Sequence, residues 1–326
     1  MLLGDPAGVG SEIIAKLASG DFFTQFCRPV IIGDMRVMRR GMEAAGVDVE
    51  FQVVSSVDEI DWSLREIPFL DRKNCDPAEV PFGKISVSGG AVCLDMLELG
   101  VNLYKEGKIE GFCFTPLNKA AMKDAGCTVE SEHHFMAALF NHSGPFGEIN
   151  VLGDLWTTRT TSHIPIKEVS DALSVESIMR AMRLADFSLR KSGKAHPHLG
   201  LCALNPHAGE EGRCGREEID VIAPAIAEAK KAGINASGPY PSDIAFIRAF
   251  EGQFDGVVTM YHDQGQIALK LKGFDQGITI AGGLPAPIAT CAHGTAYDIA
   301  GKGVVKTSAF ENAVKMVAKM ALHAAQ

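Results

Sequence analysis

Short apolar or β-branched runs that alternate with helical patterns are the feature that most restricts the fold of this chain. Six runs have the length and composition of strands: residues 29–34, 111–116, 148–154, 199–205, 256–261 and 277–283. Apolar residues recur at helical spacing in residues 217–232 (Ile219, Ile222, Ile226, Ala229) and near the C-terminus (Phe310, Val314, Val317, Ala321). This alternation predicts an α/β protein with mostly parallel sheets that helices cover on both faces. In such sheets, ligands bind at the carboxyl ends of the strands.

Composition excludes several classes of protein. A chain of 326 residues can form two α/β lobes or one large domain. Its net charge of -9 argues against a general nucleic-acid or anionic-membrane surface, and no apolar run approaches the roughly 18 residues of a membrane span. The eight cysteines are scattered without a CxxC pair, and no secretory signal is apparent. We therefore expect a cytoplasmic protein with reduced thiols.

Three histidines each follow a short apolar or β-branched run. They are His163 in "TTSHIPI", His207 in "LNPHAGEEG" and His262 in "GVVTMYHDQG". Imidazole is a common ligand of zinc and similar divalent ions, and three ligands leave a position open for water or substrate. For each residue alone, the alternative is a hydrogen-bonded loop histidine. The adjacent His133 and His134 are a weaker pair, because neighbouring helical side chains point in different directions.

Two aspartates lie beside these histidines. Asp263 follows His262, and Asp243 occurs in "GPYPSDIAF". Each could orient a ligand or line the metal pocket. The alternative for Asp243 is a cap on the helix that follows it.

Two glycine-rich stretches are candidate ligand loops. Residues 4–13, "GDPAGVGSEI", precede a helical pattern, so they form either an anion site at a helix N-terminus or only a tight turn. Residues 292–303, "AHGTAYDIAGKG", are similar to the loop of isopropylmalate and isocitrate dehydrogenases that wraps the adenosine of the nicotinamide cofactor. This resemblance assigns cofactor binding to His293, Gly294, Thr295, Ala296 and Asp298. A carboxylate at Asp298 favours NAD over NADP, because it repels the 2′-phosphate.

The motifs together resemble the 4-hydroxythreonine-4-phosphate dehydrogenase family, which includes dihydrodiol dehydrogenase relatives. They are "GDPAGVG", "TPLNKAAM", "SHIPI", "LNPHAGEEG", "GPYPSD", "MYHDQG" and "HGTAYDIAGKG", and they cover nearly the whole chain. The resemblance implies a two-lobed fold like that of isocitrate and isopropylmalate dehydrogenases, with an inter-lobe cleft, and a homodimer with shared active sites. It also implies NAD and a divalent metal on His163, His207 and His262. We expect zinc, with Mg, Mn or Co as alternatives.

The substrate residues depart from the family pattern. The resemblance places substrate contacts at Ser131, Glu132, Lys270 and Thr279, with Thr279 replacing an asparagine. Ile288 stands where the family has a phosphate-binding arginine. Isoleucine cannot replace a bidentate arginine-to-phosphate contact, so an unphosphorylated cis-dihydrodiol carboxylate of the terephthalate type stays an alternative substrate.

The implied activity is NAD-dependent oxidation of a secondary alcohol in a hydroxy acid, with decarboxylation of the resulting β-keto acid. Lys119, Asp243 and Asp263 are candidates for proton transfer, and Lys119 could equally anchor an anion. A phosphate acyltransferase of the same general fold is a third hypothesis, but it explains neither "MYHDQG" nor the adenosine loop. We expect one lobe of residues 1–125 plus 285–326, which carries the cofactor loop, and another of residues 126–284, which carries the histidines.

Overall fold

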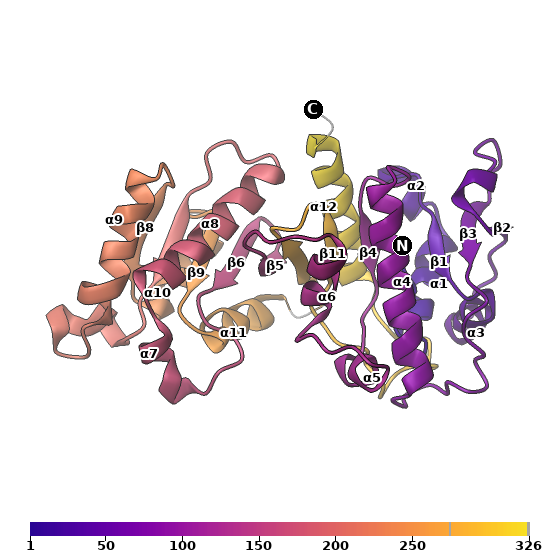
Figure 1. Cartoon of the computed structure of the whole chain (residues 1–326), viewed down its shortest axis with the longest axis horizontal. Coiled ribbons are helices and arrows are strands. Elements are labelled where there is room, and N and C mark those ends of the chain that lie inside the picture. The colour runs from indigo at the N-terminus through magenta and orange to yellow at the C-terminus, as the bar shows by residue number, and fades with distance from the viewer. Residues whose placement is uncertain (274, 325–326) are drawn as a thin grey trace. The chain divides into compact units, whose positions relative to one another are not determined.

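The structure is a computed structural model, and it describes residues 1–273 and 275–324 (Figure 1). The chain forms two compact units. The first comprises Met1–Ser143 and Leu284–Leu322, and the second comprises Gly144–Gly283 and residues 323–324. Residues 126–143 therefore belong to the first unit, not to the second as expected. The reason is the helix at residues 132–139, whose His133 and Met136 are buried against the first unit.

The first unit contains a parallel sheet. Its strands are β1 (Ile31–Gly33), β2 (Phe51–Val54), β3 (Ile67–Asp71), β4 (Phe112–Phe114) and β11 (Ile288–Cys291). β1, β3 and β2 are parallel neighbours, as are β4 and β11. Leu2 forms parallel bridges with both Ile32 and Phe114, so a strand of hardly more than one residue joins β1 to β4. The loop "GDPAGVG" leaves the sheet from this point.

Helices pack around this sheet, and a short 3-10 turn lies within the unit. They are α1 (Gly10–Ala18), α2 (Phe22–Phe26), α3 (Met35–Ala45), η1 (Val57–Glu59), α4 (Val87–Lys105), α5 (Lys119–Asp124), α6 (Glu132–Leu139) and α12 (Ser308–Ala324). α1 packs on α3, and α4 packs on both α5 and α6. On α12, Phe310, Val314 and Val317 are buried, which confirms the pattern seen in the sequence.

The second unit contains a mixed sheet in the order β10-β5-β6-β9-β7-β8. The strands are β5 (Gly147–Leu152), β6 (Leu155–Arg159), β7 (Leu199–Cys202), β8 (Ala236–Tyr240), β9 (Gly256–Thr259) and β10 (Ile278–Gly282). β10 and β6 run antiparallel to β5, whereas β6, β9, β7 and β8 are parallel neighbours. Every residue of β7 and β9 is buried, as expected for parallel strands with both faces covered. The predicted α/β class with mostly parallel sheets is confirmed.

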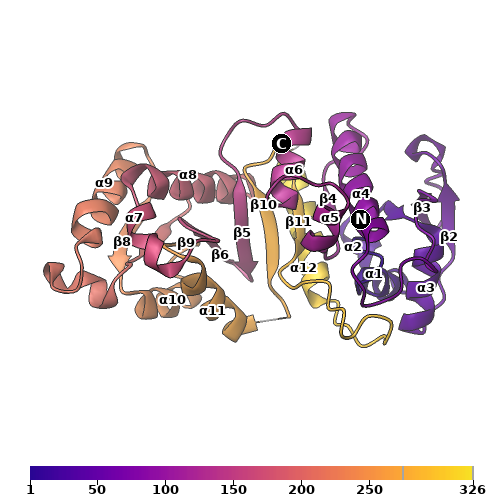
Figure 2. The ribbon, with the colours of Figure 1, turned by 60° about the horizontal axis from the view of Figure 1, so that its bottom comes forward.

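Helices cover both faces of this second sheet (Figure 2). The elements are η2 (Ile166–Glu168), α7 (Val169–Ala172), α8 (Val175–Lys191), η3 (Pro206–Gly212), η4 (Glu218–Ile222), α9 (Ala223–Lys231), α10 (Ser242–Phe250) and α11 (His262–Gly273). α8 lies on one face, and α10 and α11 lie on the other. η4 is a π turn, and its wider winding shifts the predicted helix out of phase, so Ile222 and Ile226 are buried but Ile219 is exposed. No helix of the described chain is both long and apolar enough to cross a membrane.

Candidate active site

Four parallel strands of the second unit end at one edge of the sheet, and each leads into a candidate residue. β6 leads to His163, β9 to His262, β7 to His207 and β8 to Asp243. The carboxyl ends of neighbouring parallel strands share an edge, which is the usual place for a ligand site in such sheets. The structure thus places the three histidines at strand ends, as the sequence predicted.

Two of the histidines lie close together. The ring centroids of His163 and His262 are 6.1 Å apart, and the ring planes are inclined by 42°. His262 is the first residue of α11, and its Nδ1 lies 2.7 Å from Oδ1 of Asp263. A ring whose Nδ1 is held by a carboxylate presents Nε2 as a ligand atom. Asp263 therefore acts on the ring orientation of His262.

The third histidine does not join this pair within one chain. Among the residues that the structure describes, no group of three or more His, Cys, Asp or Glu side chains could hold a metal ion. His207 lies in the turn after β7, where its backbone is left-handed (φ 52°, ψ 30°). A single chain thus brings together two of the three predicted ligands, and the three-histidine site stays a prediction.

The turn that carries His207 is strained. Residues 207–211 all have positive φ, and only one of them, Gly209, is a glycine. The left-handed conformation costs an L-residue roughly 1–2 kcal/mol, so such a run persists only where its surroundings determine it. Runs of this kind cluster at functional sites.

Glu218 holds the start of this turn. Its Oε1 accepts hydrogen bonds from the backbone amides of Leu204 (2.9 Å) and Asn205 (2.8 Å), and its Oε2 accepts one from Asn205 Nδ2 (3.0 Å). Glu218 is only 3% exposed. The sequence pattern did not single out this residue, although its side chain fixes the backbone that precedes His207.

Gln264 connects three of the strand ends. Its Oε1 accepts from the amide of Met260 (2.8 Å), and its Nε2 donates to the carbonyl of Ala203 (2.8 Å) and to Ser242 Oγ (2.9 Å). These partners follow β9, β7 and β8 respectively. The side chain therefore fixes the segments that lead to His262, His207 and Asp243. Asp243 itself is exposed in the first turn of α10, where its Oδ1 accepts from the Ile244 amide (3.0 Å) and Pro241 is the cap residue.

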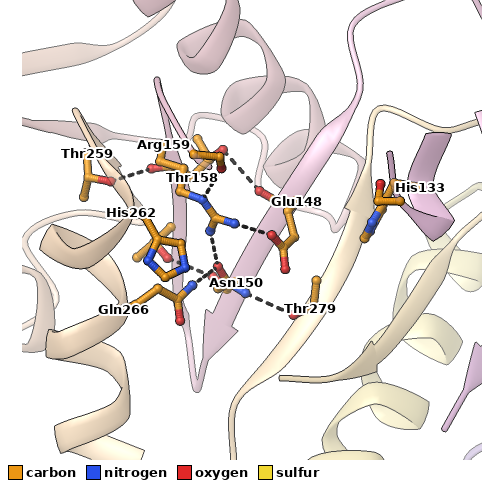
Figure 3. Close-up of polar contacts among 12 residues, drawn as sticks. His133, Glu148, Asn150, Thr158, Arg159, Thr259, His262, Gln266 and Thr279 are labelled. Carbon is orange, nitrogen blue, oxygen red and sulfur yellow. Dashed lines mark hydrogen bonds and ion pairs between the residues drawn. The ribbon is translucent and has the colours of Figure 1, made fainter. Parts of the chain in front are cut away.

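A buried polar network lies beside His262 (Figure 3). Asn150 Oδ1 accepts from Arg159 Nη1 (2.9 Å) and from Gln266 Nε2 (2.6 Å), and Asn150 Nδ2 donates to Thr279 Oγ1 (3.0 Å). Gln266 is one helical turn after His262 on α11, so both side chains share a face of that helix. Thr279, predicted to contact substrate, is buried and already hydrogen-bonded in this network.

Arg159 ties the network to the loop of His163. Its guanidinium pairs with Glu148, and its Nε donates to Ser162 Oγ (2.6 Å), next to His163. The arginine side chain is 7% exposed. It supplies a buried, neutralised cation that is hydrogen-bonded to the residue before His163. Lys270, another predicted substrate residue, is exposed on α11.

In the first unit, Lys119 and Glu132 form an ion pair. Each begins a helix, and Lys119 Nζ lies 3.6 Å from Glu132 Oε2. Glu132 Oε1 lies 3.5 Å from Nδ1 of the buried His133. Ser131 is the cap residue of α6, and its Oγ lies 2.9 Å from His134 Nδ1. Lys119, a candidate for proton transfer, thus pairs with Glu132, which is expected to contact substrate together with Ser131.

The two glycine-rich stretches pack on each other. The Val9 amide donates to the carbonyl of Thr295 (3.1 Å), and a Cβ on Gly8 would come within 3.1 Å of the Thr295 Cβ. The amides of Ala7 and Gly8 donate to Asp5. Because the amides of residues 7–9 all have partners within the protein, "GDPAGVG" forms a tight turn that supports the second loop. The alternative of an anion site at the first turn of α1 stays a prediction.

The predicted cofactor loop presents an open surface. Gly294 and Asp298 are exposed, His293 and Thr295 are half-buried, and a Cβ on Gly294 would meet no atom within 4 Å. Ala296 has a positive φ of 48°. A carboxylate and a side-chain-free backbone that face outward are suited to a ribose diol.

Ile288 is completely buried as the first residue of β11, in register with Phe112 of β4. The position is therefore a core position in this chain. An arginine could not be accommodated here without burying a charge.

Comparison with known proteins agrees with these motifs. Residues 25–317 match the family model described as pyridoxal phosphate biosynthetic protein PdxA. A relative from Pseudomonas aeruginosa named "Putative 4-hydroxythreonine-4-phosphate dehydrogenase 2" is 44% identical over 100% of this chain and 97% of its own length. D-threonate 4-phosphate dehydrogenase from Salmonella typhimurium is 33% identical over 98% and 97%.

Solved structures show the same relationship. A 4-hydroxythreonine-4-phosphate dehydrogenase from Klebsiella pneumoniae has a TM-score of 0.86 and 32% identity, with 98% of this chain and 96% of that chain covered. A terephthalate 1,2-cis-dihydrodiol dehydrogenase from Burkholderia xenovorans LB400 has a TM-score of 0.65 and 26% identity over 98% and 96%. Because the family model and these relatives cover most of its length, the chain belongs to the PdxA family, that of 4-hydroxythreonine-4-phosphate dehydrogenase.

Proposed function

We propose that this protein is an NAD- and divalent-metal-dependent dehydrogenase that oxidises a secondary alcohol in a phosphorylated four-carbon hydroxy acid, with decarboxylation of the β-keto product. The observation that carries the proposal is the pair His163 and His262 at the carboxyl edge of the sheet, in a chain of this family. The relatives named above act, by their names, on 4-hydroxythreonine 4-phosphate or D-threonate 4-phosphate.

The donor set fits a borderline divalent ion such as zinc. Two imidazoles approach each other at the edge of the sheet, and Asp263 holds one of them by Nδ1. His163 and His262 would hold the ion, with His207 as the third ligand. A bound ion would lower the pKa of the substrate alcohol and stabilise the charge left by decarboxylation.

The protein's own side chains would hold the substrate and move protons. Asp263 fixes the ring of His262, and Gln264 fixes the strand ends on either side. Lys119, Asp243 and Asp263 are the candidates for proton transfer, and the first of them already lies beside a carboxylate in Glu132. The exposed Lys270 would attract the substrate's anionic group.

The cofactor would bind at residues 293–298. Asp298 is exposed there and could accept hydrogen bonds from both ribose hydroxyls. The same charge would repel a 2′-phosphate, so NAD is the proposed cofactor.

A second copy of the chain would complete the site. One chain does not bring His207 to His163 and His262. α10 and α11 also expose large apolar side chains, among them Ile247, Ile267 and Leu271, the last of which is 84% exposed. We propose that these side chains belong to one apolar patch, because a contiguous patch of this kind marks a protein–protein interaction surface. Since α11 begins at His262, a homodimer formed through these helices would place a partner next to the site.

The second candidate substrate is an unphosphorylated cis-dihydrodiol carboxylate. The likeness to the terephthalate dihydrodiol enzyme favours it. NADH formation measured with D-threonate 4-phosphate, 4-phosphohydroxythreonine and terephthalate dihydrodiol would decide between the two. The proposal predicts the highest kcat/KM with a phosphorylated acid, and turnover of the dihydrodiol alone would refute it.

A further inference from the structure

The structure assigns Tyr297 as a positioning residue for the cofactor loop, acting through its hydrogen bond to Asp5. The inference rests on the proposed function, because it concerns the same nicotinamide cofactor. Tyr297 lies between Ala296 and Asp298, two of the residues assigned to adenosine binding. Its hydroxyl donates to Asp5 Oδ2 at 2.5 Å.

Asp5 is a fixed acceptor. Its carboxylate is 1% exposed, and its other oxygen, Oδ1, accepts from the amide of Ala7 at 2.9 Å. Burial raises the pKa of the Tyr297 hydroxyl, and the bond to Asp5 raises it further, so the phenol keeps its proton and remains the donor. Burial raises the pKa of Asp5, while the bonds from Tyr297 and the Ala7 amide act in the opposite direction, because they stabilise the charged carboxylate. A hydrogen bond to the charged form is stronger than one to a neutral acceptor.

The loop needs such an anchor because its backbone is strained. Ala296, directly before Tyr297, has a left-handed φ of 48°. A non-glycine residue in this conformation persists only where neighbouring contacts hold it. The hydrogen bond from the next side chain is one such contact, and the Val9 amide, which donates to Thr295, is another.

A second anchor holds the far end of the loop. The buried Glu12 accepts from the amide of Gly301 at 2.6 Å and from that of Gly303 at 2.8 Å. Between these two anchors, Asp298 is exposed. Hydrogen bonds thus connect the loop to α1 and to the turn before it, while Asp298 remains exposed for a ligand. A preformed loop of this kind binds its ligand without the entropic cost of ordering.

Tyr297→Phe tests the assignment, because it removes the hydroxyl and keeps the ring. Tyr104→Phe is the matched control: Tyr104 also donates its hydroxyl within the first unit, to the carbonyl of Pro285 at 3.1 Å, but from α4. NADH affinity would be measured by calorimetric titration of the full-length protein, and loop order by amide hydrogen exchange of residues 293–303 without cofactor.

We expect Tyr297→Phe to raise the Kd for NADH about tenfold and to speed amide exchange in the loop, as the loss of one charge-assisted hydrogen bond implies. Tyr104→Phe should change neither. Unchanged NADH affinity and loop exchange in Tyr297→Phe would overturn the inference alone. If the wild-type protein bound no NADH, the proposed cofactor would be wrong and the inference would fall with it.

Discussion

The imidazole rings of His163 and His262 lie 6.1 Å apart at the ends of neighbouring parallel strands, β6 and β9. This proximity within one chain determines how a shared site would be assembled. His163 and His262 would come from one subunit, and His207 from its partner. The arrangement leads to a test by subunit mixing.

Two inactive variants should restore activity only in one kind of pair. In a mixed dimer of His163→Ala and His207→Ala chains, one of the two sites has all three histidines. The rate of NADH formation per mixed dimer should therefore be about half that of a wild-type dimer. A mixed dimer of His163→Ala and His262→Ala chains has no complete site and should stay inactive. Activity in the second mixture but not in the first, with subunit exchange verified by mass spectrometry, would contradict this division of ligands.

Glu218→Ala should destabilise the protein and impair metal binding together. The variant loses the acceptor for two backbone amides in front of a strained turn, which should cost about 2–3 kcal/mol of unfolding free energy. Glu228→Ala on α9, which loses an exposed ion pair with Lys231, should cost less than about 0.5 kcal/mol. Denaturant unfolding and zinc titration would measure both effects. Unaltered zinc affinity in a folded Glu218→Ala protein would show that this turn does not position a metal ligand.

Asp298→Ser should relax the choice of cofactor. The wild-type protein should use NAD in preference to NADP, because the exposed carboxylate repels the 2′-phosphate. Removing the charge should raise kcat/KM with NADP about tenfold relative to NAD. Equal efficiency of the wild-type protein with both cofactors would argue against the assigned loop.

Ile288→Arg should destabilise the protein and should not increase its activity on a phosphorylated substrate. Ile288 is 0% exposed on β11, so the variant buries an unpaired charge at a cost of at least about 3 kcal/mol. Ile288→Val, which only shortens the side chain, should cost about 1 kcal/mol. Thermal unfolding would compare the two. A stable Ile288→Arg protein with increased turnover of 4-phosphohydroxythreonine would show that the position faces the site.

The sequence predicted β1, β4, β5, β7, β9 and β10, and it missed β2, β3, β6, β8 and β11. β7 and β9 are buried along their whole length, and their composition makes them recognisable. β6, with the sequence "LWTTR", and β8, with "ASGPY", were not predicted, because polar side chains, glycine and proline are poor signals of a strand. Their place in the sheet depends on the neighbouring strands.

The candidate site residues were predictable from the sequence, but the hydrogen bonds that position them were not. Histidines after strands are visible in the sequence, and so is the cofactor loop. The bonds of Gln264 to Ala203 and of Glu218 to Leu204 depend on tertiary contacts, and the first of these spans 61 residues. The pairing of Tyr297 with Asp5 spans 292 residues and has no local signal.

Metal content and NADH formation, measured in the same sample, test the proposed function most directly. The protein would be assayed with D-threonate 4-phosphate and 4-phosphohydroxythreonine as purified, after chelation and dialysis, and after zinc is supplied again. We predict turnover of a phosphorylated acid that disappears with the metal and returns with it, and that does not return in His262→Ala. Full turnover by protein shown to be metal-free, or the same recovery in His262→Ala, would contradict the account.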